Sequence, residues 1–246
     1  MDEDRTVTPL IERRPDAPNS ERVDHGRRSK NAATRLEAAA FRSVLCGIDN
    51  SAYGRAARDQ AKLLASPGGR VKLVPLPQLT HRGDRALQDA CEGFDPLALG
   101  AGEGAFRALE HARIPVLIAR WLPLATDLTG TMLVPVDDSP ESRRAVVLAG
   151  RLAAAHGGAV AVLAATPRDT AFQRAIAASQ RILLQATGAA PRLVGEPLPR
   201  EEIIRSTAVA LPASLVILGT GPSETERRIA AQIAERVGSS VLALPG

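Results

Sequence analysis

The sequence contains few of the side chains that stack on bases, bind metals or form disulfides. Aromatic residues make up 2% of its 246 residues, so platforms for stacking nucleic-acid bases are scarce. The 2 cysteines, Cys46 and Cys91, fit no metal-binding spacing and predict structural thiols in a reducing, cytoplasmic setting. The 4 histidines are far apart in sequence, which predicts surface positions and no metal site. They are His25, His81, His111 and His156.

The first forty residues also lack the apolar core of a signal peptide, and their early acidic residues differ from those of a transit peptide. They are charged, mixed in sign and interrupted by Pro9, Pro15 and Pro18. We therefore expect a disordered tail over residues 1–40, with a short helix over Ala32 to Ala40, and no association with a membrane.

The charge of the chain gives little support to nucleic-acid binding. A formal net charge of +4 and a sequence pI near 9.7 are a mild basic excess for so long a chain. A basic cluster in the tail, Arg27, Arg28 and Lys30, could contact an anionic partner, but a solvated tail is the favoured interpretation. Strong salt dependence of DNA retention would identify a nucleic-acid binder, the least favoured of the functions considered.

A stretch over residues 131–166 reads as a complete strand, helix and strand. The apolar run MLVPV ends at Asp137, which is typical of a strand buried on both faces. Ser139 suits an N-cap and Pro140 the first helical position, so a helix is predicted to begin at Pro140. Apolar residues then recur at helical spacing until His156, Gly157 and Gly158 end the helix, and a second strand begins at Val160. The order predicts a right-handed parallel crossover.

An earlier copy of this unit runs from Ser43 to Leu76. The pair Gly68 and Gly69 corresponds to Gly157 and Gly158 after a shift of a single residue. At an offset of 88, the identical pairs are Leu45 and Leu133, Asp49 and Asp137, Ser51 and Ser139, Arg55 and Arg143, Ala57 and Ala145, and Leu64 and Leu152. Self-similarity over so many positions indicates a tandem of two α/β units.

The copies then differ in length. The first has only about twenty residues, Pro77 to Asp95, in which we expect little more than one helix, near Arg85 to Cys91. The second has nearly fifty, Pro167 to Ala213. There the predicted elements are a helix over Asp169 to Thr187, a strand around Leu193 and Val194, and a helix over Arg200 to Leu211. The first copy has therefore lost a helix and an edge strand.

Both copies end with the same three elements. These are a buried strand whose last residue is glycine, then a helix, then a final strand. These elements are predicted at Pro96 to Gly100, Gly104 to Ala112 and Val116 to Ala119, and at Leu215 to Gly219, Glu224 to Val237 and Val241 to Leu244. Pairing of the two last strands would join the copies and remove two sheet edges.

The predicted fold class is α/β, with two tandem parallel-sheet sandwich domains of Rossmann type, the first of them shortened. The division is a tail (1–40), a first domain (41–122), a linker (123–130) and a second domain (131–246).

Several of these residues carry a family resemblance. The strand ends GIDNS and PVDDS, the later strand that ends in LG, and HARIPVLIAR at His111 to Arg120 resemble the universal stress protein family, the UspA-like domains. The resemblance covers roughly Phe41 to Gly246. It implies parallel five-stranded α/β sandwiches with the domains paired two by two.

Nucleotide-binding members of that family carry a glycine motif after the fourth strand: Gly, two residues, Gly, nine residues, then Gly with Ser or Thr. Small residues there let backbone amides and a helix N-terminus approach phosphate. Gly219 fits the first position, but Pro222 occupies the second, and Gln232 with Ile233 replace the final pair. Allowing one deletion places Gly221 second. The first copy also lacks the final pair, so the motif is incomplete in both.

The remaining residues near this motif argue against triphosphate binding. Pro222 removes an amide donor, and Glu224 and Glu226 would repel phosphate at the helix start. Asp49 and Asp137 match the family position that faces the adenosine part of a nucleotide, although capping of the following helix is the favoured interpretation.

The favoured function is therefore that of a universal stress protein-like, non-catalytic regulatory protein. It would form a pseudo-dimer within one chain, act through protein contacts and need no cofactor, with a homodimer of the chain left open. No catalytic constellation is present, because Ser51 and Ser139 read as helix caps without a partner histidine. The alternative is an adenine-nucleotide-binding protein that holds ATP or AMP in the second domain through Asp137, Gly219 and Gly221.

Overall fold

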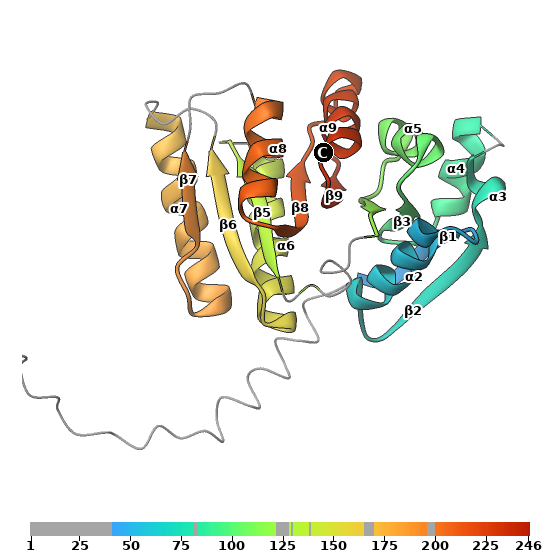
Figure 1. Cartoon of the computed structure of the whole chain (residues 1–246), viewed down its shortest axis with the longest axis horizontal. Helices are drawn as coiled ribbons and strands as arrows, with labels where there is room; N and C mark the ends of the chain where they lie inside the picture. Colours follow the sequence, from blue (N-terminus) through green and yellow to red (C-terminus); the bar gives the residue numbers. More distant parts are fainter. Residues whose placement is uncertain are drawn as a thin grey trace, which may run out of the picture.

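The computed structural model describes residues 41–80, 83–121, 128, 130–137, 139–164, 170–195 and 200–246. The predicted tail with its helix over Ala32 to Ala40, and most of the predicted linker, lie outside these residues. Within them a nine-stranded, mostly parallel sheet is flanked by helices, which confirms the α/β fold class (Figure 1). The boundaries of two domains stay a prediction, and we refer below to a first half (β1 to β4) and a second half (β5 to β9).

The elements of the first half are, in order, β1 (Phe41–Ile48), α2 (Ala52–Leu64), β2 (Ala65–Pro75), α3 (Leu76–Thr80), α4 (Gly83–Cys91), β3 (Leu97–Gly100), α5 (Glu103–His111) and β4 (Val116–Ala119). The sequence predicted little more than one helix between β2 and β3, near Arg85. The structure has two, because Leu79 is only 2% exposed and anchors α3, a helix of 5 residues, in the core. So short a helix has no periodicity from which it could be predicted.

The elements of the second half are β5 (Thr131–Val136), α6 (Pro140–His156), β6 (Ala159–Ala164), α7 (Thr170–Thr187), β7 (Arg192–Gly195), α8 (Arg200–Ala210), β8 (Ala213–Gly219), α9 (Glu224–Arg236) and β9 (Ser240–Leu244). Helix α6 begins at Pro140 as predicted, because the Ser139 side chain accepts a hydrogen bond from the Ser142 amide. It ends at His156 and is followed by the C-cap Gly157, whose φ of 73° favours glycine.

The strands form one sheet in the order β2-β1-β3-β4-β9-β8-β5-β6-β7. Within each half the paired strands are parallel, whereas β4 and β9 pair antiparallel, with Leu117 opposite Leu242. The predicted pairing of the two last strands is therefore confirmed, and Figure 1 shows β9 and α9 on the side of the second half that faces the first half. Because the halves run in opposite directions, the carboxyl ends of β1 and β3 lie at the opposite edge of the sheet from those of β5 and β8.

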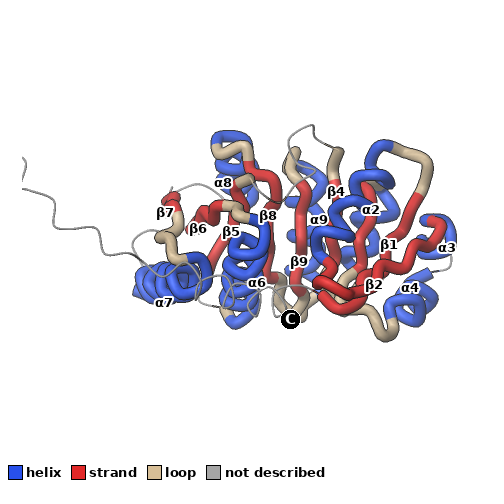
Figure 2. Tube along the Cα trace, turned by 90° about the horizontal axis from the view of Figure 1, so that it is seen from below, coloured by secondary structure: helices blue, strands red, loops and turns tan. Residues whose placement is uncertain are grey.

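The two faces of the sheet carry separate hydrophobic clusters, and Figure 2 shows the strands with helices packed around them. One cluster includes residues of α3, α4, α5, α8 and α9. The other includes residues of α2, α6 and α7. Each cluster contains residues of both halves, so the halves share their cores.

Two arginines form hydrogen bonds between the halves beside the pairing of β4 with β9, which we call the seam. Arg120, which follows β4, donates from Nη2 to the carbonyls of Ala234 and Glu235 at the end of α9, both at 2.7 Å. Arg227 of α9 donates from Nε to the Glu110 carbonyl of α5 at 2.8 Å. Each half thus supplies a cation to the carboxyl end of a helix in the other, where the helix dipole favours it.

Candidate functional site

A small pocket lies at the carboxyl ends of β5 and β8, beside the start of α9. Its volume is about 70 Å³, which is room for a few water molecules. The lining residues are Asp137, Ser139, Glu141, Ile204, Leu218, Gly219, Thr220, Gly221, Glu226, Ile229, Ala230 and Ile233. Open α/β sheets bind ligands at this edge, so the pocket is the candidate site.

Asp137 enters the pocket from the end of β5 and is held by the loop that follows. Its Oδ1 accepts hydrogen bonds from the amide of Ser139, at 3.0 Å, and from the Ser139 hydroxyl. The hydroxyl of Ser142 donates to the Asp137 carbonyl at 2.6 Å. Asp137 therefore orients Ser139, and Ser139 in turn caps α6, so this carboxylate supports the helix start indirectly.

Gly219 ends β8, where the strand touches the beginning of α6. A Cβ at this position would lie 2.4 Å from the Glu141 carbonyl carbon and 2.5 Å from the Ser142 nitrogen. Contacts so short involve backbone and cannot be relieved by a side-chain rotation. Close helix–strand packing alone therefore accounts for glycine at position 219.

The carboxylate of Glu226 lies directly against Gly221. A Cβ on Gly221 would meet both carboxylate oxygens of Glu226, at 2.1 and 2.3 Å. Oε2 of Glu226 accepts from the Ser223 amide at 3.2 Å, and the Ser223 hydroxyl accepts from the Glu226 amide at 3.2 Å. This capping box places a negative charge where the amides at the start of α9 would otherwise face an anion.

The pocket is acidic. Asp137, Glu141 and Glu226 all line it, and none of its lining residues that the structure describes is lysine or arginine. Glu141 pairs at the surface with Arg144, whose Nη2 lies 3.0 Å from its Oε1. Pro222 in the same loop has no amide to donate. The arrangement disfavours a polyphosphate, since carboxylates repel phosphate oxygens.

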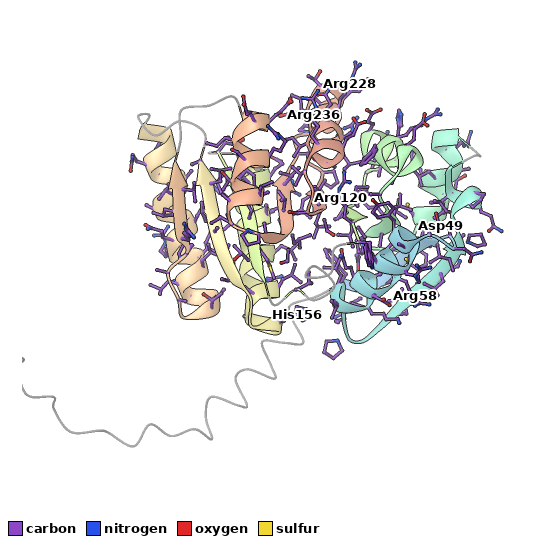
Figure 3. All side chains as sticks on the ribbon, in the orientation of Figure 1. Asp49, Arg58, Arg120, His156, Arg228 and Arg236 are labelled. Atoms are coloured by element: carbon purple, nitrogen blue, oxygen red, sulfur yellow. The ribbon has the colours of Figure 1, made fainter. Side chains whose placement is uncertain are left out.

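Of the four predicted binding residues, the structure brings Asp137, Gly219 and Gly221 together and leaves Asp49 apart. Asp49 follows β1 at the opposite edge of the sheet (Figure 3) and is exposed. Its Oδ1 accepts a hydrogen bond from the Ser51 amide at 2.9 Å. Its geometry repeats that of Asp137. The two acids therefore belong to two equivalent strand ends and not to one site.

The sequence interpretation missed Glu141 and the apolar wall of the pocket, which Ile204, Ile229 and Ile233 provide from α8 and α9. The position of Glu226 had a signal, because Ser223 followed three residues later by Glu226 is a capping-box pattern. Glu141 had none, since its place in the pocket depends on the approach of β8 to α6.

The remaining candidate groups lie away from the pocket. Burial raises the pKa of the Cys46 thiol to about 12 and that of Cys91 to about 11. His156 was predicted at the surface, but the structure shows it half-buried. Its Nε2 lies 3.0 Å from the Leu63 carbonyl of α2, so the ring packs against that helix. His25 and His81 lie outside the described residues.

In the described ranges, no cluster of three or more His, Cys, Asp or Glu side chains could hold a metal. None of the helices in the same ranges combines the length and hydropathy needed to cross a bilayer.

Comparisons with known proteins find similarity in structure. No family model matches the sequence, and no curated protein matches it. A universal stress protein from Archaeoglobus fulgidus superposes with a TM-score of 0.62 at 14% identity, over 85% of this chain and 98% of the other. A putative universal stress protein from Pseudomonas aeruginosa UCBPP-PA14 gives 0.57 at 17% identity, over 86% and 95% of the two chains.

A functionally unknown protein from Pseudomonas aeruginosa PAO1 also gives a TM-score of 0.57, at 17% identity over 86% of this chain and 94% of the other. These matches span nearly the whole described chain, with its nine-stranded sheet and flanking helices. The chain therefore has the UspA-like fold of the universal stress proteins.

Proposed function

We propose that this protein is a non-catalytic stress-response regulator that works through protein contacts in the cytoplasm and uses no ATP. One observation carries the proposal: the Glu226 carboxylate lies against Gly221 and is held there by Ser223. A nucleotide phosphate would need that space and the amides behind it. The Asp137 carboxylate, which also lines the pocket, adds further repulsion.

We also propose that one chain acts as a pseudo-dimer, and the pairing of β4 with β9 supports this. The two halves present equivalent strand ends at opposite edges of one sheet. Binding of partner proteins on such a scaffold needs no reaction centre. Ser51 and Ser139 serve as N-caps in this arrangement, which supports a structural role for both hydroxyls.

The alternative is that the second half binds an adenine nucleotide through Asp137, Gly219 and Gly221. The position of the pocket favours it, because ligands of open α/β sheets lie at the carboxyl ends of strands. AMP would suit the pocket better than ATP, since it places fewer charges near Glu226.

A thermal-shift titration of the full chain with ATP, AMP and cyclic AMP separates the two functions, because a bound ligand stabilises the fold. We expect no rise in the melting temperature with any of them at millimolar concentration. A rise of several degrees in the melting temperature that disappears in Asp137→Ala would contradict the proposed function and support the nucleotide-binding alternative. A rise that persists in Asp137→Ala would place a nucleotide elsewhere and would also contradict the proposal.

A further inference from the structure

Strand β2 forms one end of the sheet (Figure 1). Among the strands that the structure describes, it pairs with β1 alone. Its counterpart β6 pairs with β5 on one side and with β7 on the other. The described part of the first half contains no counterpart of β7. The N–H and C=O groups of β2 that point away from β1 therefore have no partner strand among the described elements.

The edge of β2 is long and regular. Arg70 to Pro75 pair with Ser43 to Ile48 without interruption. Strand β7, which forms the other end of the sheet, has only 4 residues. Short edge strands are one means by which proteins avoid pairing with other chains. Strand β2 does not use this protection, so its edge offers room for one more strand.

One face of this edge is apolar. Val71 and Leu73 lie on the side of the sheet that α2 covers, where Val71 packs against the hydrophobic cluster and Leu73 is 44% exposed. Leu73 pairs with Cys46 of β1, just as Val162 of β6 pairs with Val134 of β5. Val162 is fully buried. An apolar side chain on an added strand would give Leu73 the cover that its counterpart has.

The other face of the edge is basic. Arg70 and Lys72 are exposed and lie over the ring of Phe94, with the guanidinium carbon 5.3 Å and Nζ 5.7 Å from its centroid. The carboxylate of the neighbouring Asp95 is directed elsewhere, since its Oδ2 accepts from the Arg42 amide at 3.1 Å. Within the described residues, neither cation of β2 has a carboxylate partner.

The charge of the edge selects the strand that fits it. A second copy of the chain, paired antiparallel along β2, would bring Arg70 and Lys72 close to their own copies, and like charges across strands are destabilising. A strand with acidic side chains on that face would instead form cross-strand ion pairs with both cations. Because successive side chains of a strand alternate between its faces, the same strand would present apolar side chains to Leu73.

We propose that the edge of β2 binds an extended segment of a partner protein in which acidic and apolar residues alternate. Backbone hydrogen bonds to the open edge supply affinity, and the two faces of β2 supply specificity. The inference rests on the proposed function, because this segment provides one of its protein contacts. Strand β2 and the pocket beside Gly221 belong to different halves of the sheet, so the nucleotide titration and the experiment below give separate answers.

NMR of the full chain with three synthetic peptides tests the proposal. EVEVEV carries the alternation, KVKVKV reverses its charge, and EEEVVV keeps its composition without the alternation. In the free chain we expect fast hydrogen exchange at the β2 amides that point away from β1. EVEVEV at millimolar concentration should shift the β2 signals, slow this exchange, and bind at least about tenfold more tightly than either other peptide.

A charge reversal provides the second measurement. The variant that combines Arg70→Glu with Lys72→Glu should bind KVKVKV more tightly than EVEVEV, and this gain also shows that the variant is folded. The control combines Arg151→Glu with Arg228→Glu, which makes the same change of charge at exposed positions of the second half. It should keep the preference of the wild type for EVEVEV.

Four results would overturn the proposal. The first is equal binding of the three peptides, and the second is a preference for EVEVEV that survives the charge reversal on β2. The third is a set of shifted amides that lies outside β2. The fourth is slow exchange at the outward amides of β2 in the free chain, which would assign the edge to the chain itself or, where protection rises with protein concentration, to a second copy.

Discussion

Gly219 has a packing role that a substitution can separate from any ligand role. The added methyl group of Gly219→Ala would collide with the backbone of Glu141 and Ser142 and push β8 away from α6. We expect the free energy of unfolding to fall by about 2–3 kcal/mol, as for other overpacked sites. Urea denaturation followed by circular dichroism measures the change.

Gly238→Ala is the matched control, because a Cβ at Gly238 would have no neighbour within 4 Å. It should change the free energy of unfolding by less than about 0.5 kcal/mol. If Gly219→Ala were as mild as this control, close packing would not explain the glycine and a ligand role would regain support.

The buried thiols make the stability depend on alkaline pH. Burial raises the pKa of Cys46 from 9.0 to about 12 in the folded chain, so the thiol stays neutral there while the unfolded chain ionises above pH 9. The folded state then holds more protons, and stability must fall as pH rises through this window. Below about pH 8 the thiol is protonated in both states and contributes almost no pH dependence.

Denaturation of the wild type and Cys46→Ala, each from neutral pH to about pH 10, checks this linkage. The wild type should lose more of its unfolding free energy over that range than the variant does. Identical slopes for the two proteins would show that the Cys46 thiol ionises equally in the folded and unfolded chains.

At the scale of elements, the helix ends at the seam depend on side chains from the opposite half. Arg120→Met removes two hydrogen bonds to the carbonyl end of α9, and also the contact of its guanidinium carbon with the Phe106 ring, 5.9 Å from the centroid. We expect a loss of about 2 kcal/mol in the free energy of unfolding. Arg228→Met, an exposed change on α9, should cost less than about 0.5 kcal/mol. If the two variants lost the same amount of unfolding free energy, Arg120 would not stabilise the end of α9 as a cap.

Local signals in the sequence were sufficient for most elements and for part of the site. Helix α6 was predictable because Ser139 and Pro140 mark its start and Gly157 its end. The pairing of β4 with β9 followed from the internal repeat. Helix α3 and the position of Glu141 were not predictable, because each depends on contacts with distant parts of the chain.

The whole molecule should unfold as one unit. The sheet is continuous across β4 and β9, and both hydrophobic clusters contain residues of the two halves. We expect a single transition in urea, with the same midpoint for Trp121 fluorescence, which reports on the surroundings of the β4–β9 pairing, and for circular dichroism, which reports on the whole chain. Two separated midpoints would show that the halves are independent.

The central claim is that the Glu226 carboxylate occupies the space a phosphate would need. Isothermal titration calorimetry of ATP into the full chain, with Glu226→Ala beside the wild type, tests it most directly. The account predicts no saturable binding to the wild type at millimolar ATP, and tighter binding to the variant because its loop has lost the blocking charge. Micromolar binding of ATP to the wild type, with no gain in Glu226→Ala, would contradict it.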